Sequence, residues 1–529
     1  MNPLPRLVCI LSFALFALSV TGQTADWRVI PLPREITLSG GNGFLITPST
    51  TIAYPEGNIE LERCAAFLAD YICTATGMQL RLTDAQTRTN AIVLTLADTT
   101  AHAESYRLCA DEQQVTIASP TPAGIFRGIQ TLRKSLPIGE TSEVLLPAAT
   151  INDAPRFDYR GAHFDNARHF FTVEETKQYI DMMALHNINY LHFHLTDNQG
   201  WRLEIPEYPR LIEVGSKRSF DGPDYGGFLT QDEARELVRY AQERYITIVP
   251  EIDLPSHMQA AIASYPELGC TGDTAQDVLC LGNDSTIAFI DHLLLTLIDI
   301  FPSPYIHIGG DECPRTFWEQ CPKCQQRIES EGLRPRHHFT SEQRLQSWIT
   351  QHAVNLLARH GRRLIGWDEI LEGGLAEGAT VMSWRGESGG LAAARMGHDA
   401  IMTPGEYLYF DHCQSADPST EPRSQGGYLP VSKVYSYEPV PAKLSRSQAA
   451  HIIGLQSNLW TEYIKTFSHA QYMVLPRWAA MCEVQWRPKD TKDYGDFLMR
   501  LPRLLRWYEA EGYTYAKHVL GQPGQTTFE

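Results

Sequence analysis

The feature that most constrains the fold is a regular alternation of strand-like and helix-like segments that begins near residue 158. Short apolar runs rich in β-branched and aromatic residues predict buried strands. Amphipathic segments with helical spacing separate most of these runs. The predicted helices are 172–186, 231–244, 286–300, 341–360 and a final long helix over 468–486. The predicted strands are 161–164, 190–194, 246–251, 305–308, 363–367, 380–384, 398–402 and 452–460.

Eight strands alternating with helices predict the α/β class and a (β/α)8 TIM barrel of about 350 residues. We assign residues 155–515 to this barrel and residues 516–529 to a C-terminal tail. Residues 23–154 carry strand-like runs at 91–96 and 114–117 and helical patterns at 60–76 and 121–134. They predict a small N-terminal α+β domain, and since no polar cluster converges there, we interpret it as a supporting domain.

The first 22 residues have the pattern of a signal peptide that is removed on export. Arg6 supplies a positive charge, 7–18 is an apolar run, and small residues follow at 20–22. No later stretch is apolar enough over the length that a membrane span needs. We therefore expect a periplasmic or secreted protein without a membrane span. The formal charge of −17 argues against a nucleic-acid partner, and the sequence leaves the oligomeric state open.

Acidic and aromatic side chains follow the ends of the predicted strands. The strand at 305–308 runs into Gly309-Gly310, where the backbone can turn sharply, and then into the adjacent acids Asp311 and Glu312. In a parallel barrel the chemistry lies at the carboxyl ends of the strands. The remaining strand ends carry Asp165, Asp197, Glu251, Asp253, Trp367, Trp384, Tyr409, Asp411 and Trp460. This ring of acids and aromatics predicts the active site.

Ten cysteines remain once the predicted signal peptide is removed, and their pairing is not fixed by the sequence. Cys321 and Cys324 form a CxxC motif, with Cys313 nearby. A zinc site is one alternative here, but it needs four ligands, and no second CxxC or HxxxH motif completes the set. We therefore predict disulfides or free thiols, with no metal and no cofactor.

Seven short motifs, in order between residues 159 and 462, resemble glycoside hydrolase family 20, the β-N-acetylhexosaminidases. They are YRG at 159 with Asp165 and RHF at 168, HLTDNQGWR at 194, PEIDLPSH at 250, HIGGDE at 307, GWDE at 366, SWRG at 383 and LWTE at 459. Residues 27–150 resemble the small domain that often precedes the barrel. Two departures from the family pattern are His257, where Gly is more usual, and the undistinctive segment before Tyr409.

The adjacency of Asp311 and Glu312 is a poor fit to a mechanism that uses two protein carboxylates. Neighbouring Cα atoms are about 3.8 Å apart, whereas a nucleophile and an acid should flank the scissile bond. The resemblance instead implies substrate assistance, in which the 2-acetamido oxygen of the substrate attacks the anomeric carbon. Glu312 is then the general acid, with a pKa raised by burial and neighbouring charge, and Asp311 stays ionised and accepts the acetamide N–H.

The resemblance also assigns the remaining site residues. Tyr409 would donate its hydroxyl to the acetamide oxygen, and Trp367, Trp384 and Trp460 would form the walls of the pocket. Arg160 would bind the 3- and 4-hydroxyls, with Asp411 and Glu462 binding hydroxyls at positions 4 and 6. Asp197 and His257 would orient the two acids. The resemblance further suggests a disulfide between Cys270 and Cys280.

These features predict an exo-acting enzyme that removes terminal β-linked N-acetylglucosamine or N-acetylgalactosamine from glycans. Two alternatives stay open. His192 and His194 form an HxH pair of the kind that a metal-dependent barrel hydrolase uses. A non-catalytic sugar-binding protein on an inactive barrel is the other, although Asp311 and Glu312 are both present.

Overall fold

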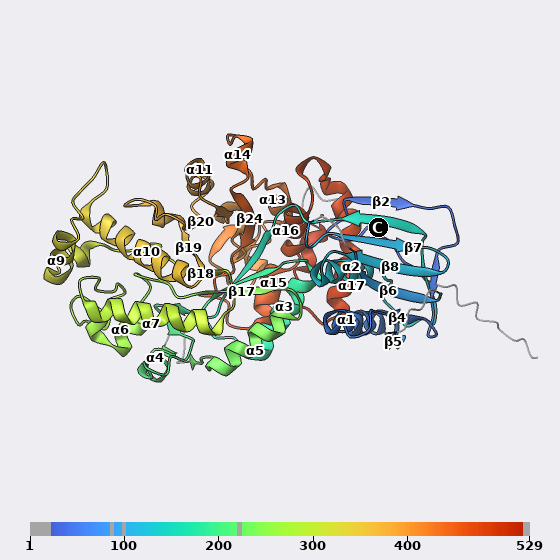
Figure 1. Ribbon diagram of the computed structural model, residues 1–529, viewed down its shortest axis with the longest axis horizontal. Coiled ribbons are helices and arrows are strands. Elements are labelled where there is room, and N and C mark those ends of the chain that lie inside the picture. Colours follow the sequence, from blue (N-terminus) through green and yellow to red (C-terminus); the bar gives the residue numbers. More distant parts are fainter. Residues whose placement is uncertain (1–22, 85–88, 98–101, 219–224, 522–529) are drawn as a thin grey trace, which may run out of the picture.

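The computed structural model describes residues 23–84, 89–97, 102–218 and 225–521. The predicted signal peptide and the last eight residues of the predicted tail lie outside this part of the chain. Figure 1 shows two packed parts, a blue N-terminal sheet at one end and the barrel with its helices at the other.

The N-terminal part is an α+β unit built on a seven-stranded mixed sheet in the order β2-β10-β7-β8-β6-β4-β5. Two helices pack together on this sheet, α1 (Ile59–Thr76) and α2 (Pro122–Ser135). A three-stranded sheet, β1-β9-β3, lies beside it. The strands are β1 (Gln23–Thr24), β2 (Glu35–Leu38), β3 (Phe44–Ile46), β4 (Thr51–Ala53), β5 (Arg81–Thr83), β6 (Ala91–Leu96), β7 (Tyr106–Ala110), β8 (Gln114–Ser119), β9 (Val144–Leu146) and β10 (Ala149–Asp153).

Eight parallel strands close into a barrel, as the sequence predicts. Their side chains are almost all buried, because the interior is packed and helices cover the outside. The barrel closes where β24 pairs with β11. In order around the barrel the strands are β11 (Tyr159–Asp165), β12 (Tyr190–His194), β17 (Thr247–Glu251), β18 (Tyr305–His307), β19 (Arg363–Trp367), β20 (Thr380–Ser383), β21 (Ala400–Met402) and β24 (Ile452–Ser457).

The helices follow the predicted pattern with one correction near the C-terminus. The first of these helices begins with a capping box between Thr172 and Glu175. The predicted single helix over 468–486 is wrong, because Pro476 cannot continue a helical hydrogen-bond ladder and separates α15 from α16. A further helix, α17, follows. The longer helices are α3 (Val173–Leu185), α5 (Gln231–Gln242), α7 (Asp284–Ile300), α10 (Ser341–Arg359), α11 (Ser388–Arg395), α15 (Phe467–Val474), α16 (Arg477–Trp486) and α17 (Tyr494–Ala510).

Shorter elements lie in the loops that connect the barrel strands. They are α4 (Arg210–Glu213), α6 (Gln259–Ser264), α8 (Thr316–Gln320), α9 (Pro322–Ser330), α12 (Gly405–Leu408), α13 (Val431–Ser436) and α14 (Arg446–Ala449). Residues 516–521, predicted as part of a tail, pack on the barrel, since Ala516 and Val519 are buried and the Ala516 amide donates to the Leu475 carbonyl at 3.1 Å.

A buried ionic network joins the two parts at the amino ends of the barrel strands. Glu104 of the N-terminal domain lies between two buried arginines, 2.8 Å from Arg127 Nε and 2.7 Å from Arg160 Nη2. Burial would raise the pKa of Glu104, but the two guanidinium groups outweigh it and lower the pKa to about 2. Trp486 of α16 also donates its indole N–H to Asp153 at 2.9 Å. Glu104 therefore pairs with one arginine of its own domain and with one arginine of the barrel.

Candidate active site

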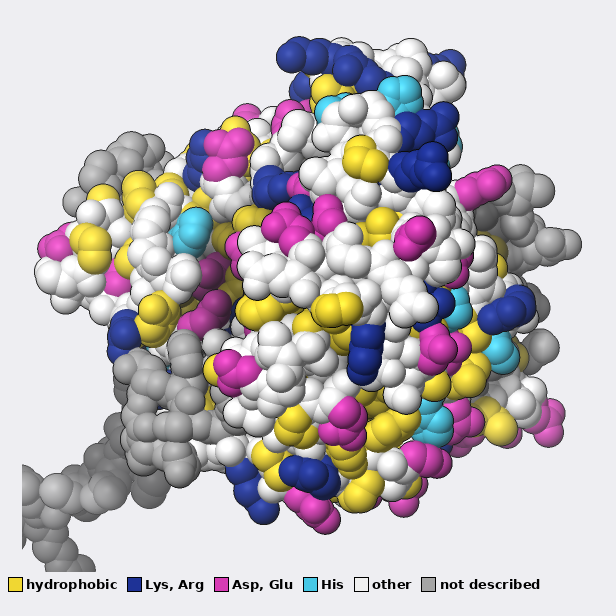
Figure 2. All heavy atoms as spheres, turned by 90° about the vertical axis from the view of Figure 1, so that its left-hand side faces the viewer, with side chains coloured by type: hydrophobic (Ala, Val, Ile, Leu, Met, Phe, Trp, Pro, Cys, Tyr) yellow, Lys and Arg dark blue, Asp and Glu magenta, His cyan; other side chains and the backbone are white. Residues whose placement is uncertain are grey.

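A cavity of about 640 Å³ opens at the carboxyl ends of the barrel strands. This end of the molecule faces the viewer in Figure 2, which shows acidic and hydrophobic side chains interspersed across it. Nine of the eleven predicted site residues line the cavity, namely His257, Asp311, Glu312, Trp367, Trp384, Tyr409, Asp411, Trp460 and Glu462. Asp197 lies behind this lining and Arg160 lies elsewhere.

The turn after β18 places the two adjacent acids. Gly309 and Gly310 both have positive φ, and a Cβ on Gly309 would lie 1.7 Å from an oxygen of Asp253, so only glycine fits there. Glu312 itself has a φ of +48°, a rare conformation for a side-chain-bearing residue that is typical of functional sites. The turn leaves the Asp311 side chain largely buried and that of Glu312 60% exposed.

One carboxyl oxygen of Asp311, Oδ1, is buried and has no hydrogen-bond partner among the described residues. Burial raises the pKa of Asp311, while His257 and a hydrogen bond from Asp253 act in the opposite direction. Burial and the charge of Asp311 together raise the pKa of Asp253 far more. Asp253 therefore holds the proton of this pair, and Asp311 is the carboxylate.

His257 connects the acids to the groups beneath them. Its Nδ1 lies 3.3 Å from Asp197 Oδ1, and its Nε2 lies 3.7 Å from Asp311 Oδ2 and 3.6 Å from Glu312 Oε2. Burial lowers the pKa of His257, but the surrounding carboxylates outweigh burial and raise it well above its usual value. His257 is therefore an imidazolium that orients both acids, with Asp197 holding it from below.

The predicted rise in the pKa of Glu312 is wrong. The nearby His257, 3.6 Å away, lowers the pKa, and burial opposes this only in part because the side chain is half exposed. The sequence suggested a buried acid beside another negative charge. The structure places a positive imidazolium between the two acids instead.

Aromatic rings form the walls of the cavity. Trp384 and Tyr409 stack at 6.1 Å between ring centroids, and Trp367 and Trp460 lie 5.7 Å apart. Trp367 is fully buried and donates its indole N–H to Glu251 at 3.1 Å. Rings fixed in this way present apolar faces of the kind that pack against sugar rings.

The predicted role of Arg160 is wrong, because this residue lies near the amino end of β11. Its guanidinium is fully buried and bonds Glu104 and the backbone carbonyls of Asn187 and Phe157. Arg168 lies beyond the carboxyl end of the same strand and lines the cavity. It bonds Asp165 at 3.0 Å and Asp197 at 2.9 Å and lies 3.9 Å from Glu462. Sequence reasoning missed Arg168, and the signal that could have found it is its position after the carboxyl end of the strand rather than near its start.

Asp411 and Glu462 lie at the Arg168 side of the cavity. Asp411 is buried, and its Oδ1 has no hydrogen-bond partner within the described part of the chain. Burial first, and then the nearby Glu462, raises the pKa of Asp411 to about 8. An unpaired buried acceptor beside a cation is suited to binding a ligand hydroxyl.

The HxH pair does not line the cavity. His192 Nε2 lies 2.9 Å from Glu251, and His194 Nδ1 also bonds Glu251. A third imidazole, His307 Nδ1, lies 2.8 Å from the same carboxylate. All four groups are fully buried below Trp367. The pair therefore contacts a buried carboxylate beneath the cavity instead of lining it.

The suggested disulfide between Cys270 and Cys280 is absent from the structure. All ten cysteines among the described residues are free thiols. Cys270 and Cys280 instead lie close to Cys321 and Cys324.

An acid-rich, tryptophan-walled pocket at the top of a (β/α)8 barrel defines a carbohydrate-active class of site. The model of the catalytic domain of glycosyl hydrolase family 20 matches residues 157–489, and that of domain 2 of the same family matches residues 26–154. The chain belongs to glycosyl hydrolase family 20.

Named relatives agree with this assignment. A β-hexosaminidase of Porphyromonas gingivalis is 42% identical over 516 residues, which cover 94% of this chain and 65% of the relative. The chain therefore spans about two thirds of that protein's length. An exo-β-N-acetylglucosaminidase of Vibrio harveyi, solved with N-acetylglucosamine, matches with a TM-score of 0.83 and 31% identity over 94% of this chain and 79% of that one. The structure of a β-N-acetylhexosaminidase of Streptomyces coelicolor A3(2) matches with a TM-score of 0.81 and 32% sequence identity. The match covers 95% of this chain and 99% of that one.

Proposed function

We propose that the protein is an exo-acting β-N-acetylhexosaminidase that releases terminal, non-reducing β-linked N-acetylglucosamine or N-acetylgalactosamine. The observation that carries this proposal is the unpaired, buried oxygen of Asp311 next to Glu312 in an aromatic pocket. An acceptor without a donor in such a place fits the N–H of a 2-acetamido group. The names of the relatives support the same activity.

The first chemical step uses the acetamido group of the substrate as nucleophile. The Asp311 carboxylate accepts the acetamide N–H, which turns the acetamide oxygen toward the anomeric carbon and stabilises the positive charge that develops on nitrogen. Tyr409 donates its hydroxyl to that oxygen from the pocket wall, and Trp367, Trp384 and Trp460 surround the acetamido methyl and the ring. Holding the two reacting atoms together makes the attack intramolecular, which removes much of its entropic cost.

Glu312 protonates the leaving oxygen and then removes a proton from the water that opens the bicyclic intermediate. A general acid must be protonated before it acts, yet the pKa of Glu312 is lowered by its surroundings. A bound sugar covers the exposed carboxyl and removes water from it, and burial raises a carboxyl pKa. The pKa of Glu312 therefore rises when the substrate binds.

Arg168, Asp411 and Glu462 bind the hydroxyls of the non-reducing end. This set replaces Arg160 with Arg168 and keeps the predicted acids. A charged cluster that binds the hydroxyls of a terminal sugar supports exo action. Since the groups accept or donate in several directions, we expect the 4-epimers to be processed with a difference well below about 10⁴-fold.

Comparison of matched aryl β-glycosides tests this function. We expect release of the phenol from the N-acetylglucosaminide and, more slowly, from the N-acetylgalactosaminide, while the plain β-glucoside is inert. A thiazoline that mimics the bicyclic intermediate should inhibit strongly. Comparable turnover of the β-glucoside would refute substrate assistance, and binding without turnover would favour a sugar-binding protein.

We further propose export of the mature protein, supported by the signal-like pattern of residues 1–22. The partners are glycans or glycoconjugates that end in an N-acetylhexosamine. No helix among the described residues is both long and apolar enough to cross a membrane. N-terminal sequencing and fractionation of the producing cells test export; an intact N-terminus in the cytosol would contradict it.

A further inference from the structure

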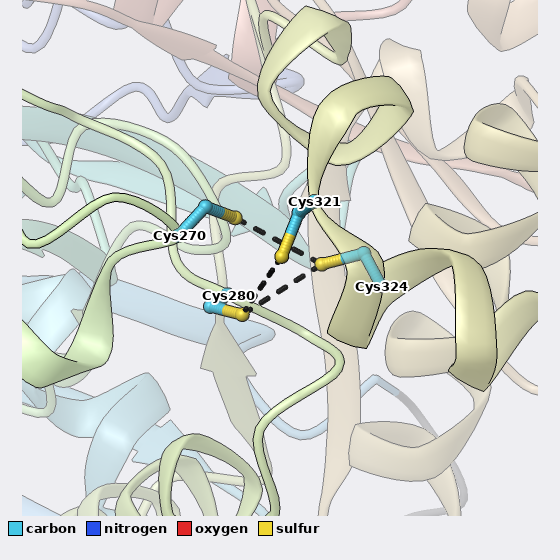
Figure 3. Close-up of side chains that lie close together, drawn as sticks. All are labelled: Cys270, Cys280, Cys321 and Cys324. Carbon is cyan, nitrogen blue, oxygen red and sulfur yellow. Dashed lines mark hydrogen bonds between the residues drawn. The ribbon is translucent and has the colours of Figure 1, made fainter.

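Four cysteine side chains converge at the edge of the barrel, outside the cavity of the active site. Figure 3 shows the sulfur atoms of Cys270, Cys280, Cys321 and Cys324 pointing toward one another. Cys280, Cys321 and Cys324 are buried and Cys270 is half-buried. The Cys270–Cys324, Cys280–Cys321 and Cys280–Cys324 sulfur separations are 3.8, 3.7 and 3.7 Å.

These separations fit a metal site better than disulfides. A disulfide needs sulfur atoms about 2.05 Å apart. Zinc bound by four thiolates has Zn–S distances of about 2.3 Å, and the edge of such a tetrahedron is about 3.8 Å. All four sulfur atoms lie within 4.8 Å of one another, so one ion at their centre could contact them all.

The surrounding backbone is shaped to hold the four sulfurs together. Cys321 is the N-cap of α9 and Cys324 lies in its first turn, which gives the CxxC pair a tight turn. The loop that carries Cys280 runs directly against this turn, since a Cβ on Gly282 would lie 2.1 Å from the backbone of Lys323. The amide of Gly282 also hydrogen-bonds the sulfurs of Cys280 and Cys324. Amide-to-sulfur bonds of this kind support thiolate ligands.

We propose that Cys270, Cys280, Cys321 and Cys324 form a structural tetrathiolate site for one zinc ion. The sequence offered one CxxC and no second motif, because Cys270 and Cys280 are ten residues apart in a loop and only the fold brings them to the helix. Four protein ligands leave no open position, so the ion has a structural rather than a catalytic role.

The site ties together the loops that carry the catalytic groups. The loop of Cys280 follows β17 and His257, and the helices α8 and α9 follow β18 and Glu312. Direct bonds continue this link, since Trp318 donates to the Leu279 carbonyl and the Leu279 amide donates to the Pro255 carbonyl, both at 2.9 Å. Zinc binding therefore stabilises the separation between His257 and the two acids.

Metal analysis of the purified full-length protein tests the site directly. We expect about one zinc per chain by inductively coupled plasma mass spectrometry. Cys321→Ser should lower the zinc content about tenfold or more. Cys73→Ser, a half-buried cysteine of α1 outside the cluster, is the matched control and should keep full zinc. Zinc retained by Cys321→Ser at the control level would overturn the proposal.

Alkylation of the wild-type protein covers the case in which the variant does not fold. Denaturation with chelator, without reductant, should leave all four cysteines open to iodoacetamide and release the zinc. Disulfides within the cluster, detected as unmodified cysteines by peptide mapping, would overturn the proposal. So would free thiols with no bound metal, or iron in place of zinc, detected by its visible absorption.

Discussion

Two arginines near the two ends of one strand show how differently the barrel uses its ends. Arg160, near the amino end of β11, bonds Glu104 and two backbone carbonyls in a fully buried network. Arg168, past the carboxyl end, shares a cavity with Asp311 and Asp411, each of which has a buried oxygen without a partner among the described residues. The three guanidinium nitrogens of Arg160 all have partners at the end that maintains the fold, whereas buried acceptors without partners mark the end that binds a ligand.

Replacing the general acid should produce the largest effect at the ligand end. We expect Glu312→Gln to lower kcat/KM by about 10² to 10⁴ on a substrate with a poor leaving group, because the departing oxygen is no longer protonated. The loss should be much smaller with an activated phenol, which leaves without help. Steady-state kinetics on the two substrates measure the difference.

Glu406→Gln is the matched control, since Glu406 is an exposed carboxylate on the rim of the same cavity. It should retain most of the activity. Equal losses on good and poor leaving groups in Glu312→Gln would remove Glu312 from the role of general acid.

The two arginines should give opposite phenotypes. Arg160→Met leaves Glu104 with only one of its two cations, and we expect a loss of about 3 kcal/mol in the free energy of unfolding, while kcat/KM of the folded fraction changes little. Arg168→Lys keeps the charge but loses the planar two-pronged geometry. It should lower kcat/KM about 10- to 100-fold with a smaller change in stability.

Thermal unfolding and kinetics on the same two preparations make this comparison. If Arg160→Met instead abolishes activity in a fully folded protein, Arg160 is not a purely structural residue. The assignment of stability to one end of the barrel and ligand binding to the other would then be wrong.

Low pH should reduce the stability of the folded protein because Glu104, at the amino ends of the barrel strands, becomes protonated. The pKa of this carboxyl is about 2 in the folded protein against an ordinary value of 4.5. A depressed pKa adds stability that is fully present above about pH 4.5 and is lost as the pH falls toward 2. We expect this carboxyl to account for about 3 kcal/mol of the loss across that window.

Denaturant unfolding at several pH values, compared between wild type and Glu104→Gln, isolates the contribution of this group. Glu56→Gln, at an exposed site of the same domain, serves as control and should follow the wild type. Parallel curves for Glu104→Gln and wild type below pH 4.5 would contradict the assignment.

The smallest expected effect concerns how kcat/KM depends on pH. His257, whose Nε2 lies 3.6 Å from Glu312 Oε2, lowers the pKa of Glu312. Replacing it in His257→Asn removes the imidazolium, so the pKa of Glu312 should rise and the acid should stay protonated to higher pH. We expect the alkaline limb of kcat/KM to move to higher pH, together with a general loss of rate. An unmoved or downward-shifted limb would show that His257 does not control Glu312.

The sequence predicted the barrel and most of the cavity because both depend on local patterns. Apolar runs of strand length reveal the eight strands, and the residue that follows a strand lies on the catalytic face whatever the details of packing. Arg160 was misplaced because its motif lies at the start of β11, a distinction that depends on where the strand ends. The pKa of Glu312 depends on His257, which is 55 positions away in the chain, and no local pattern encodes that contact.

Long-range packing explains the other differences. Pro476 marks the break between α15 and α16, but the apolar pattern on both sides suggested one helix. The cysteine cluster joins a loop after β17 to α9 after β18, so its four members share no spacing that identifies them as a set. Residues that meet only through the register of two neighbouring strands leave no signal in a single sequence.

The position of Glu104 between Arg127 and Arg160 bears on how this chain can be divided. A fragment that starts at residue 155 would keep Arg160 and lose the acid that neutralises it. Such a fragment would expose the surface around Arg160, which is buried in the whole chain, and we expect it to aggregate during expression. The small domain thus acts as an integral cover of the barrel, and gene fusions or domain exchanges that respect residue 155 as a boundary would separate two halves of one folding unit.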